Sequence, residues 1–246
     1  MGNLTDKVVL VTNVTEFVGA ATVESCLEEG ATVLAQDPSF ADMAVRHTFE
    51  QTHRGAIGLH DEDPDRLIGS IVSAQGRLDG LVANDGFPAI RAKVEDADPQ
   101  DMRDGLEAMV VQPFRLIGVA VRQMKKQGGG RIVVASSAVP FRGLSNYGMY
   151  VTGRGAQNAM VLSLARELAG QSISVNAVAP NFVENPSYFS EALLSDEAAR
   201  NKILSQIPMG RFGKGRDVSD LIAFLLSDKA GFITGTVVPV AGGWAS

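Results

Sequence analysis

Short apolar runs alternate with helix-like stretches along the 246 residues, and this alternation predicts an α/β fold. The apolar runs are rich in β-branched residues, as fully buried parallel strands are, and glycine or proline marks several of the transitions. Strands joined through helices form right-handed crossover units, which build a parallel sheet covered on both faces. The sequence therefore predicts a single α/β domain, residues 1–246, with a doubly wound, Rossmann-type sheet of seven parallel strands.

Local signals predict the individual elements in order. Gly30 closes the first helix, Pro64 opens another, and glycines 128–130 form the turn before the fifth strand. Pro113 falls within a long helical stretch and should kink or break it. The expected strands are residues 7–11, 31–35, 56–59, 78–83, 131–135, 173–178 and 236–240. The expected helices are residues 17–29, 39–51, a stretch from 64, 99–126, 148–168 and 217–226, with a short helix in the loop after Pro180.

Composition excludes several classes of partner. A net charge of -6 argues against nucleic acid and against an anionic membrane surface. The chain has no signal-like start and no apolar span of about 18 residues, so a cytoplasmic location is expected. The lone Cys26 rules out an internal disulfide and suits a reducing compartment. The histidines at 47, 53 and 60 lack metal-ligand spacing, so no metal site is expected.

A candidate catalytic group follows the fifth strand. Ser137 stands at the carboxyl end of that strand, where open α/β sheets bind ligands. Tyr150 and Arg154 are four residues apart on the next helix and therefore share one face. A nearby guanidinium lowers the pKa of a phenol, so Tyr150 could remove a proton from a substrate hydroxyl that Ser137 orients. The alternative is a buried tyrosine beside an ordinary strand-end serine, with a surface arginine nearby.

The chain resembles the short-chain dehydrogenase/reductase superfamily over nearly its whole length. The matching features are Ser137, Tyr150, the Asn-Ala-Val-Ala-Pro run at 176–180 and the Ala-Gly-Gly run at 241–243. Members of that superfamily carry a lysine four residues after the tyrosine, and it also holds the nicotinamide ribose. Here Arg154 takes that place, and an arginine can serve the tyrosine alone.

The first turn departs from the superfamily pattern in the same direction. The dehydrogenase pattern is Thr-Gly-x-x-x-Gly-x-Gly, whereas residues 12–19 read Thr-Asn-Val-Thr-Glu-Phe-Val-Gly. Phe17 stands where a glycine lets the backbone approach the pyrophosphate, and Glu16 adds a negative charge near a helix N-terminus. Only Gly19, needed for close packing of the helix, remains. The sequence therefore predicts a domain that lacks a dinucleotide-binding loop and uses no cofactor.

Taken together, these departures resemble the halohydrin dehalogenases, a cofactor-free branch of the superfamily. Their two signatures, Ser-x12-Tyr-x3-Arg and Thr-x4-Phe/Tyr-x-Gly, are both met without a mismatch. The resemblance implies that vicinal halohydrins close reversibly to epoxides, with release of halide and a proton, and that anions such as azide, cyanide or nitrite open the epoxides. It implies that Ser137 orients the substrate oxygen, Tyr150 removes its proton and Arg154 tunes Tyr150. It further implies that Asp85 passes the proton onward through water, although a purely structural acid is the alternative there.

The same resemblance assigns a halide site and a substrate pocket. The loop after the sixth strand would bind the halide through Asn181 and the backbone N–H groups of Phe182 and Val183, between walls formed by Phe17 and Pro88. The residues expected to shape the substrate pocket are Thr12, Phe141, Leu144, Tyr188 and Phe189. For each of the aromatic residues, packing in the core is the alternative interpretation.

Two other classes of function remain open at this point. Asp37 stands where a dinucleotide binder keeps its ribose-binding acid, which favours an NAD(P)-dependent oxidoreductase with an atypical phosphate loop. The halohydrin dehalogenases carry a similar Asp-x-Ser-Phe stretch, matched here by residues 37–40, so Asp37 discriminates little between the two classes. A non-catalytic scaffold that kept the fold is the third class. The superfamily resemblance also implies a homotetramer, paired through the helices at 99–126 and 148–168 and through the last strand. Trp244, near the terminus, is a candidate for reaching a neighbouring subunit.

Overall fold

The computed structural model describes residues 2–185 and 195–246. In this part of the chain one sheet has seven strands in the order β3-β2-β1-β4-β5-β6-β7, and every neighbouring pair is parallel. The strands are β1 (Val8–Val11), β2 (Thr32–Gln36), β3 (Ile57–Leu59), β4 (Gly80–Ala83), β5 (Gly130–Ala135), β6 (Ile173–Pro180) and β7 (Val237–Val240). The helices are α1 (Gly19–Glu28), α2 (Met43–Thr52), α3 (Pro64–Gln75), α4 (Pro99–Leu106), α5 (Gln112–Lys126), α6 (Gly148–Leu168), α8 (Glu197–Leu204) and α9 (Gly215–Leu226). The predicted doubly wound α/β fold is confirmed.

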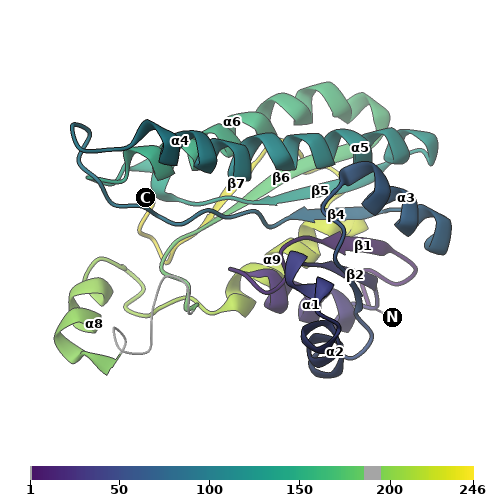
Figure 1. Ribbon diagram of the computed structural model, residues 1–246, viewed down its shortest axis with the longest axis horizontal. Helices are drawn as coiled ribbons and strands as arrows, with labels where there is room; N and C mark the ends of the chain where they lie inside the picture. Colours follow the sequence, from purple (N-terminus) through teal and green to yellow (C-terminus); the bar gives the residue numbers. More distant parts are fainter. Residues whose placement is uncertain (1, 186–194) are drawn as a thin grey trace.

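Two helical layers cover the two faces of the sheet (Figure 1). Helices α1 and α9 pack on one face, and α3, α5 and α6 pack on the other. The strands supply mostly valine, leucine, isoleucine and alanine to both apolar clusters, because a parallel sheet is buried on both sides. Figure 1 shows α8 standing apart from both layers. The strand order reverses between β1 and β4, so a crevice is expected at the carboxyl ends of these two strands.

Helices α1 and α2 both start later than expected. Helix α1 begins at Gly19, where an added Cβ would lie 2.5 Å from the Cα of Val14, so the close packing expected of this glycine is confirmed. The helix expected from residue 39 begins instead at Met43, after a 3-10 turn over Pro38–Ala41. Asp37 caps the 3-10 turn and Asp42 caps α2, and these separate caps divide one expected helix into two elements.

The long helical stretch breaks where Pro113 was expected to break it. Helix α4 passes into a π-helical turn over Glu107–Val111, and α5 starts directly afterwards with Pro113 as its second residue. Proline has no N–H to donate to the preceding turn, and the wider π turn accommodates that loss. The turn also places Met109 in the core beside the helix that carries Tyr150.

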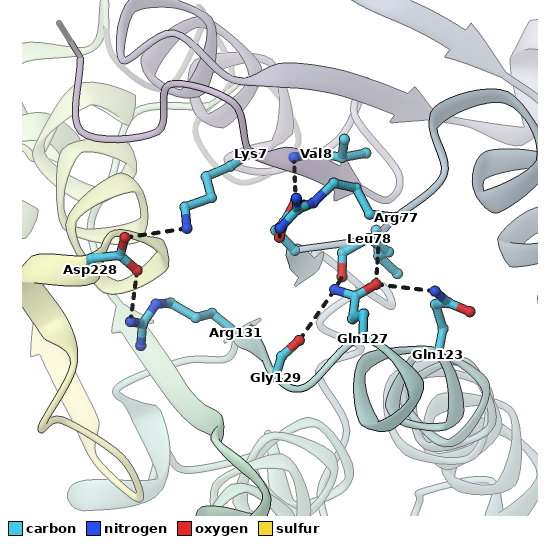
Figure 2. A network of polar contacts seen from close by, with 10 residues as sticks. Lys7, Val8, Arg77, Leu78, Gln123, Gln127, Gly129, Arg131 and Asp228 are labelled. Atoms are coloured by element: carbon cyan, nitrogen blue, oxygen red, sulfur yellow. Dashed lines mark hydrogen bonds and ion pairs between the residues drawn. The ribbon is translucent and has the colours of Figure 1, made fainter.

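A polar network ties together the amino ends of the strands (Figure 2). Asp228 lies between Lys7 and Arg131, with N–O distances of 3.2 Å to each. Gln127 exchanges two hydrogen bonds with the backbone of Leu78, at 2.7 and 3.1 Å. These contacts hold the edge of the sheet opposite the one where ligands bind in this type of fold, so they support the scaffold rather than the chemistry.

Candidate active site

Ser137 and Tyr150 reach the carboxyl edge of the sheet from consecutive elements. Ser137 follows β5, and its buried hydroxyl donates to the carbonyl oxygen of Pro180 at 3.3 Å and accepts from the N–H of Val139 at the same distance. Tyr150 is the third residue of α6 and is also buried. Ala138 and Tyr150 belong to one apolar cluster, so the residue next to Ser137 and the phenol share one environment.

Arg154 is fully buried and holds the phenol of Tyr150. Its Nε donates to the Tyr150 hydroxyl at 3.3 Å. Its Nη1 donates to the carbonyl oxygens of Ala135 and Asp85, both at 2.9 Å, and to Oε1 of Gln157 at 3.0 Å. The predicted pair on one helical face is therefore in contact, and the arginine lies inside the protein rather than at its surface. A fixed positive charge at this distance favours the phenolate form of a tyrosine.

Phe17 occupies a backbone conformation that usually requires glycine. Its φ angle is +50°, in the left-handed region that bulky residues rarely adopt. The side-chain Nδ2 of Asn84 donates to the carbonyl oxygens of Asn13 and Glu16, each at 3.0 Å, and so fixes the turn. The Phe17 ring centroid lies 5.6 Å from the guanidinium carbon of Arg154. An aromatic ring thus packs beside the candidate catalytic arginine, at the position where a dinucleotide binder needs an open backbone.

Both carboxylate oxygens of Asp37 accept hydrogen bonds from residues of this chain. One oxygen accepts the N–H and hydroxyl of Thr15, at 3.0 and 2.7 Å, and the other accepts the N–H and hydroxyl of Ser39, at 3.0 and 2.6 Å. Burial favours the neutral acid, but the four donors outweigh it and hold the pKa of Asp37 below its ordinary value. A ribose would have to compete with four existing hydrogen bonds, so Asp37 does not support a dinucleotide site in this conformation.

Asp85 carries the most unusual carboxyl group of the site. Its Oδ1 accepts from Nδ2 of Asn13 at 3.0 Å, and its buried Oδ2 has no hydrogen-bond partner among the described residues. Burial raises the pKa of Asp85 to about 7, although the charge of Arg154 and the bond from Asn13 both work in the opposite direction. Asp85 can therefore gain or lose a proton near neutral pH. The sequence pointed to Asp85, but nothing in it indicated Asn13 as its partner.

A cavity of about 1090 Å³ opens at the carboxyl ends of the first four strands. Thr12, Phe17, Asp85 and Pro88 from the predicted site all line it. Its wall also carries three further acids, Glu16, Asp61 and Glu62. Carboxylates on this wall would repel the diphosphate of a nicotinamide dinucleotide. With Phe17 in the turn and Asp37 already bonded, the residues present do not fit that cofactor.

The predicted halide loop forms a tight, partly strained turn. Phe182 has a φ angle of +54°, and its N–H donates to Oδ1 of the preceding Asn181 at 3.0 Å. Val183 is buried and pairs with Gly213 in an isolated parallel bridge. An anion here would meet a Phe182 N–H that Asn181 already engages, whereas the sequence suggested that both face the anion together.

The remaining predicted pocket residues are distributed around this edge. Phe141 and Leu144 are exposed on the segment between Ser137 and α6. Thr12 is buried, donates to the carbonyl oxygen of Val82 and accepts from the N–H of residue 84, so it links β1 to β4. Tyr188 and Phe189 lie outside the described residues. No group of histidine, cysteine or acidic side chains in the described part of the chain could hold a metal ion, and no helix there is long and apolar enough to span a membrane.

The fold and the site together define a member of a large enzyme superfamily. A family model described as enoyl-(acyl carrier protein) reductase matches residues 15–245. The 3-oxoacyl-[acyl-carrier-protein] reductase FabG of Thermotoga maritima is 35% identical over 250 residues, covering 98% of each chain. The chain therefore belongs to the short-chain dehydrogenase/reductase superfamily.

Two similar solved structures carry the names of dehalogenating enzymes. A structure named "Dehalogenation enzyme" is 48% identical with a TM-score of 0.95, covering 98% of both chains. The halohydrin dehalogenase HheC, bound to ethyl (2S)-oxiran-2-ylacetate, is 29% identical with a TM-score of 0.92, covering 96% of both chains. The resemblance to halohydrin dehalogenases that the two sequence signatures predicted is thereby confirmed.

Proposed function

We propose that this protein is a halohydrin dehalogenase, a carbon–halide lyase that interconverts vicinal halohydrins and epoxides without a cofactor. The observation that carries the proposal is the hydrogen bond from Arg154 to the Tyr150 hydroxyl, with the ring of Phe17 packed beside the same guanidinium. An activated phenol needs no ribose-binding lysine, and the Phe17 ring occupies the turn where the backbone of a dinucleotide binder approaches the pyrophosphate. The epoxide ligand of HheC supports a small epoxide as the partner here.

The reaction balances with the groups at hand. The phenolate of Tyr150 takes the proton of the substrate hydroxyl, while the Ser137 hydroxyl turns from the Pro180 carbonyl to donate to the substrate oxygen. The oxygen then uses its electron pair to attack the neighbouring carbon, and the halide leaves with the carbon–halogen pair. In the reverse direction the anion opens the epoxide and Tyr150 returns the proton. Asn181, Phe182 and Val183 are the proposed halide-binding residues.

The proton on Tyr150 must leave before the next turnover. Arg154 stays protonated and donates to both the Tyr150 hydroxyl and the backbone oxygen of Asp85. Burial raises the pKa of the Asp85 carboxyl group to about 7, and this group lines the cavity, so it can take the Tyr150 proton through an intervening water molecule and release it to solvent. We assign Asp85 this relay and Asn13 the task of orienting it.

Reduction or oxidation with a nicotinamide cofactor is the second candidate, because the sequence relatives include acyl-carrier-protein reductases. The conformation of Phe17 and the four bonds to Asp37 both argue against it. NADH or NADPH fluorescence enhancement, or a rise in Tm on adding either, would favour the reductase.

The direct test is incubation with 1,3-dichloro-2-propanol without nicotinamide, followed by chloride and acid release. We expect one equivalent of each per epoxide formed. Tyr150→Phe should lose at least about a hundredfold in turnover, because general acid–base catalysis typically contributes that much. An unchanged circular dichroism spectrum and Tm for this variant would separate a chemical role from a scaffold. No chloride release across a panel of halohydrins, or full activity in Tyr150→Phe, would refute the proposal.

We further propose a homotetramer that resides in the cytoplasm. Phe114 on α5 and Leu162 on α6 are each at least half exposed, at 54% and 50%, and such apolar side chains favour burial against another copy. Cys26 is buried, and burial raises its pKa to about 12, so the thiol is unreactive. A free cysteine of this kind is compatible with the reducing environment of the cytoplasm. A monomer in sedimentation equilibrium would refute the assembly.

A further inference from the structure

The end of the chain folds back toward the proposed halide loop. After β7, Gly242 and Gly243 adopt φ angles of +57° and +88°. An added Cβ would lie 2.7 Å from Ile207 at the first position and 3.0 Å from Pro208 at the second. This turn therefore requires glycine, and it delivers Trp244, the single tryptophan of the sequence, into a buried position.

Arg142 holds both the backbone and the ring of Trp244. This arginine follows the short turn after Ser137, 102 residues before the tryptophan in sequence. Its Nη1 donates to the carbonyl oxygen of Trp244 at 2.9 Å, and its guanidinium carbon lies 5.0 Å from the centroid of the Trp244 ring. Two contacts from one side chain thus fix the position and the orientation of the indole.

Trp244 in turn packs against the loop proposed to bind halide. The rings of Phe182 and Trp244 meet edge to face, with centroids 5.9 Å apart and an interplanar angle of 79°. Phe182 holds a left-handed conformation, which an ordinary residue keeps only when its surroundings impose it. On the backbone side, the Phe182 carbonyl accepts from the N–H of Gly213 at 2.9 Å. The indole supports the same residue from the side-chain direction.

We propose that Arg142 and Trp244 are positioning residues for Phe182, and that they set how tightly the enzyme holds the leaving halide or an incoming anion. This inference rests on the proposed function of the 181–183 loop. Trp244 and Tyr150 belong to one apolar cluster, but the polar contact of Arg142 is with the Trp244 backbone, whereas the Tyr150 hydroxyl is bonded by Arg154. The two residues therefore act on anion binding and not on proton transfer.

The test compares Trp244→Ala, Trp244→Phe and Arg142→Gln with the wild-type enzyme, and Arg54→Gln, an exposed arginine on another part of the surface, is the control. Bromide inhibition of chloride release is measured together with kcat, the pH profile and Tm. Trp244→Ala removes the aromatic pair, and Arg142→Gln removes the contacts that orient the indole; each change should raise the bromide inhibition constant roughly three- to tenfold. Trp244→Phe should recover part of the affinity, and the pH profile should match wild type throughout.

A second measurement uses the lone tryptophan directly. Bromide bound at the loop should change the fluorescence of Trp244, and the change should saturate as bromide is added. Saturation should require less bromide in the wild type than in Arg142→Gln. This variant retains Trp244, so the measurement is possible even if Trp244→Ala does not fold. Unchanged bromide inhibition in active variants, or a shift confined to Tm or to the pH profile, would overturn this inference alone. A wild-type enzyme with neither chloride release nor a bromide response would overturn the proposed function, and this inference with it.

Discussion

Replacing Asp85 by asparagine should stabilise the protein at pH 8 more than at pH 5. The wild-type carboxyl group is buried with its Oδ2 atom unpartnered among the described residues, and burial raises its pKa to about 7. The protein therefore folds more favourably when this carboxyl group is protonated. The asparagine side chain keeps a similar shape and can still accept from Asn13, but it never becomes charged.

The sign and size of the effect follow from linkage. Between about pH 4 and pH 7 the folded wild-type protein binds a proton at Asp85 that the unfolded chain has lost, so its free energy of unfolding falls as the pH rises. The difference between the ordinary pKa of 3.8 and about 7 corresponds to at most about 4 kcal/mol. The variant lacks this slope, so its advantage over wild type should grow by up to that amount across the interval.

The assay is urea unfolding of both proteins at several pH values from 3 to 8. The difference in the free energy of unfolding between the variant and the wild type is compared across pH. Any effect of the amide that does not depend on pH then cancels. Asp217→Asn is the matched control with the opposite sign. The side-chain bond from Arg211 is the main cause that lowers the pKa of Asp217 to about 2, so this variant should lose stability relative to wild type, and the loss should shrink only below about pH 4.

An Asp85→Asn difference that stays constant from pH 5 to 8 would refute the reasoning, because it would show that the carboxyl group is solvated in the folded state. The same variant should turn over more slowly in the proposed reaction, since an amide cannot carry a proton. Greater stability with lower activity would be the expected pattern for a functional group whose buried charge destabilises the fold.

Two further substitutions test the surroundings of the site, and a third, on the surface of α3, is a control. Asp37→Ala removes the acceptor of the Thr15 N–H and hydroxyl and should lower the free energy of unfolding by at least about 2 kcal/mol at pH 7. The loss should be smaller near pH 3, because the pKa of Asp37 is lowered in the folded state. Chemical denaturation at both pH values measures the two losses, and equal losses would contradict this prediction. Gly19→Ala would place a Cβ 2.5 Å from the backbone Cα of Val14, which cannot turn aside, and should cost about 1–3 kcal/mol with reduced turnover. Gly69→Ala, on an exposed helical face with open space around it, should instead gain about 0.5–1 kcal/mol, and a similar response of both glycines to thermal melting would argue against the packing explanation.

The sequence was sufficient for the elements and for the Tyr150–Arg154 pair because both depend on local periodicity. Each strand lies within about two residues of its expected range, since an apolar β-branched run bounded by turns has few alternatives. Tyr150 and Arg154 meet because residues four apart on any helix share a face. The break near Pro113 was equally local, since it follows from a missing N–H.

Long-range pairings were decided only by the tertiary structure. The sequence placed Asp37 where a ribose would be held, and folding instead turned its carboxylate onto Thr15 and Ser39. Asn13 and Asp85 meet across 72 residues of chain, and Trp244 contacts Arg142, which precedes it by 102 residues. Periodicity fixes which residues share a face of one element, but the partner of a polar group depends on how separate elements pack, and no spacing within one element records that.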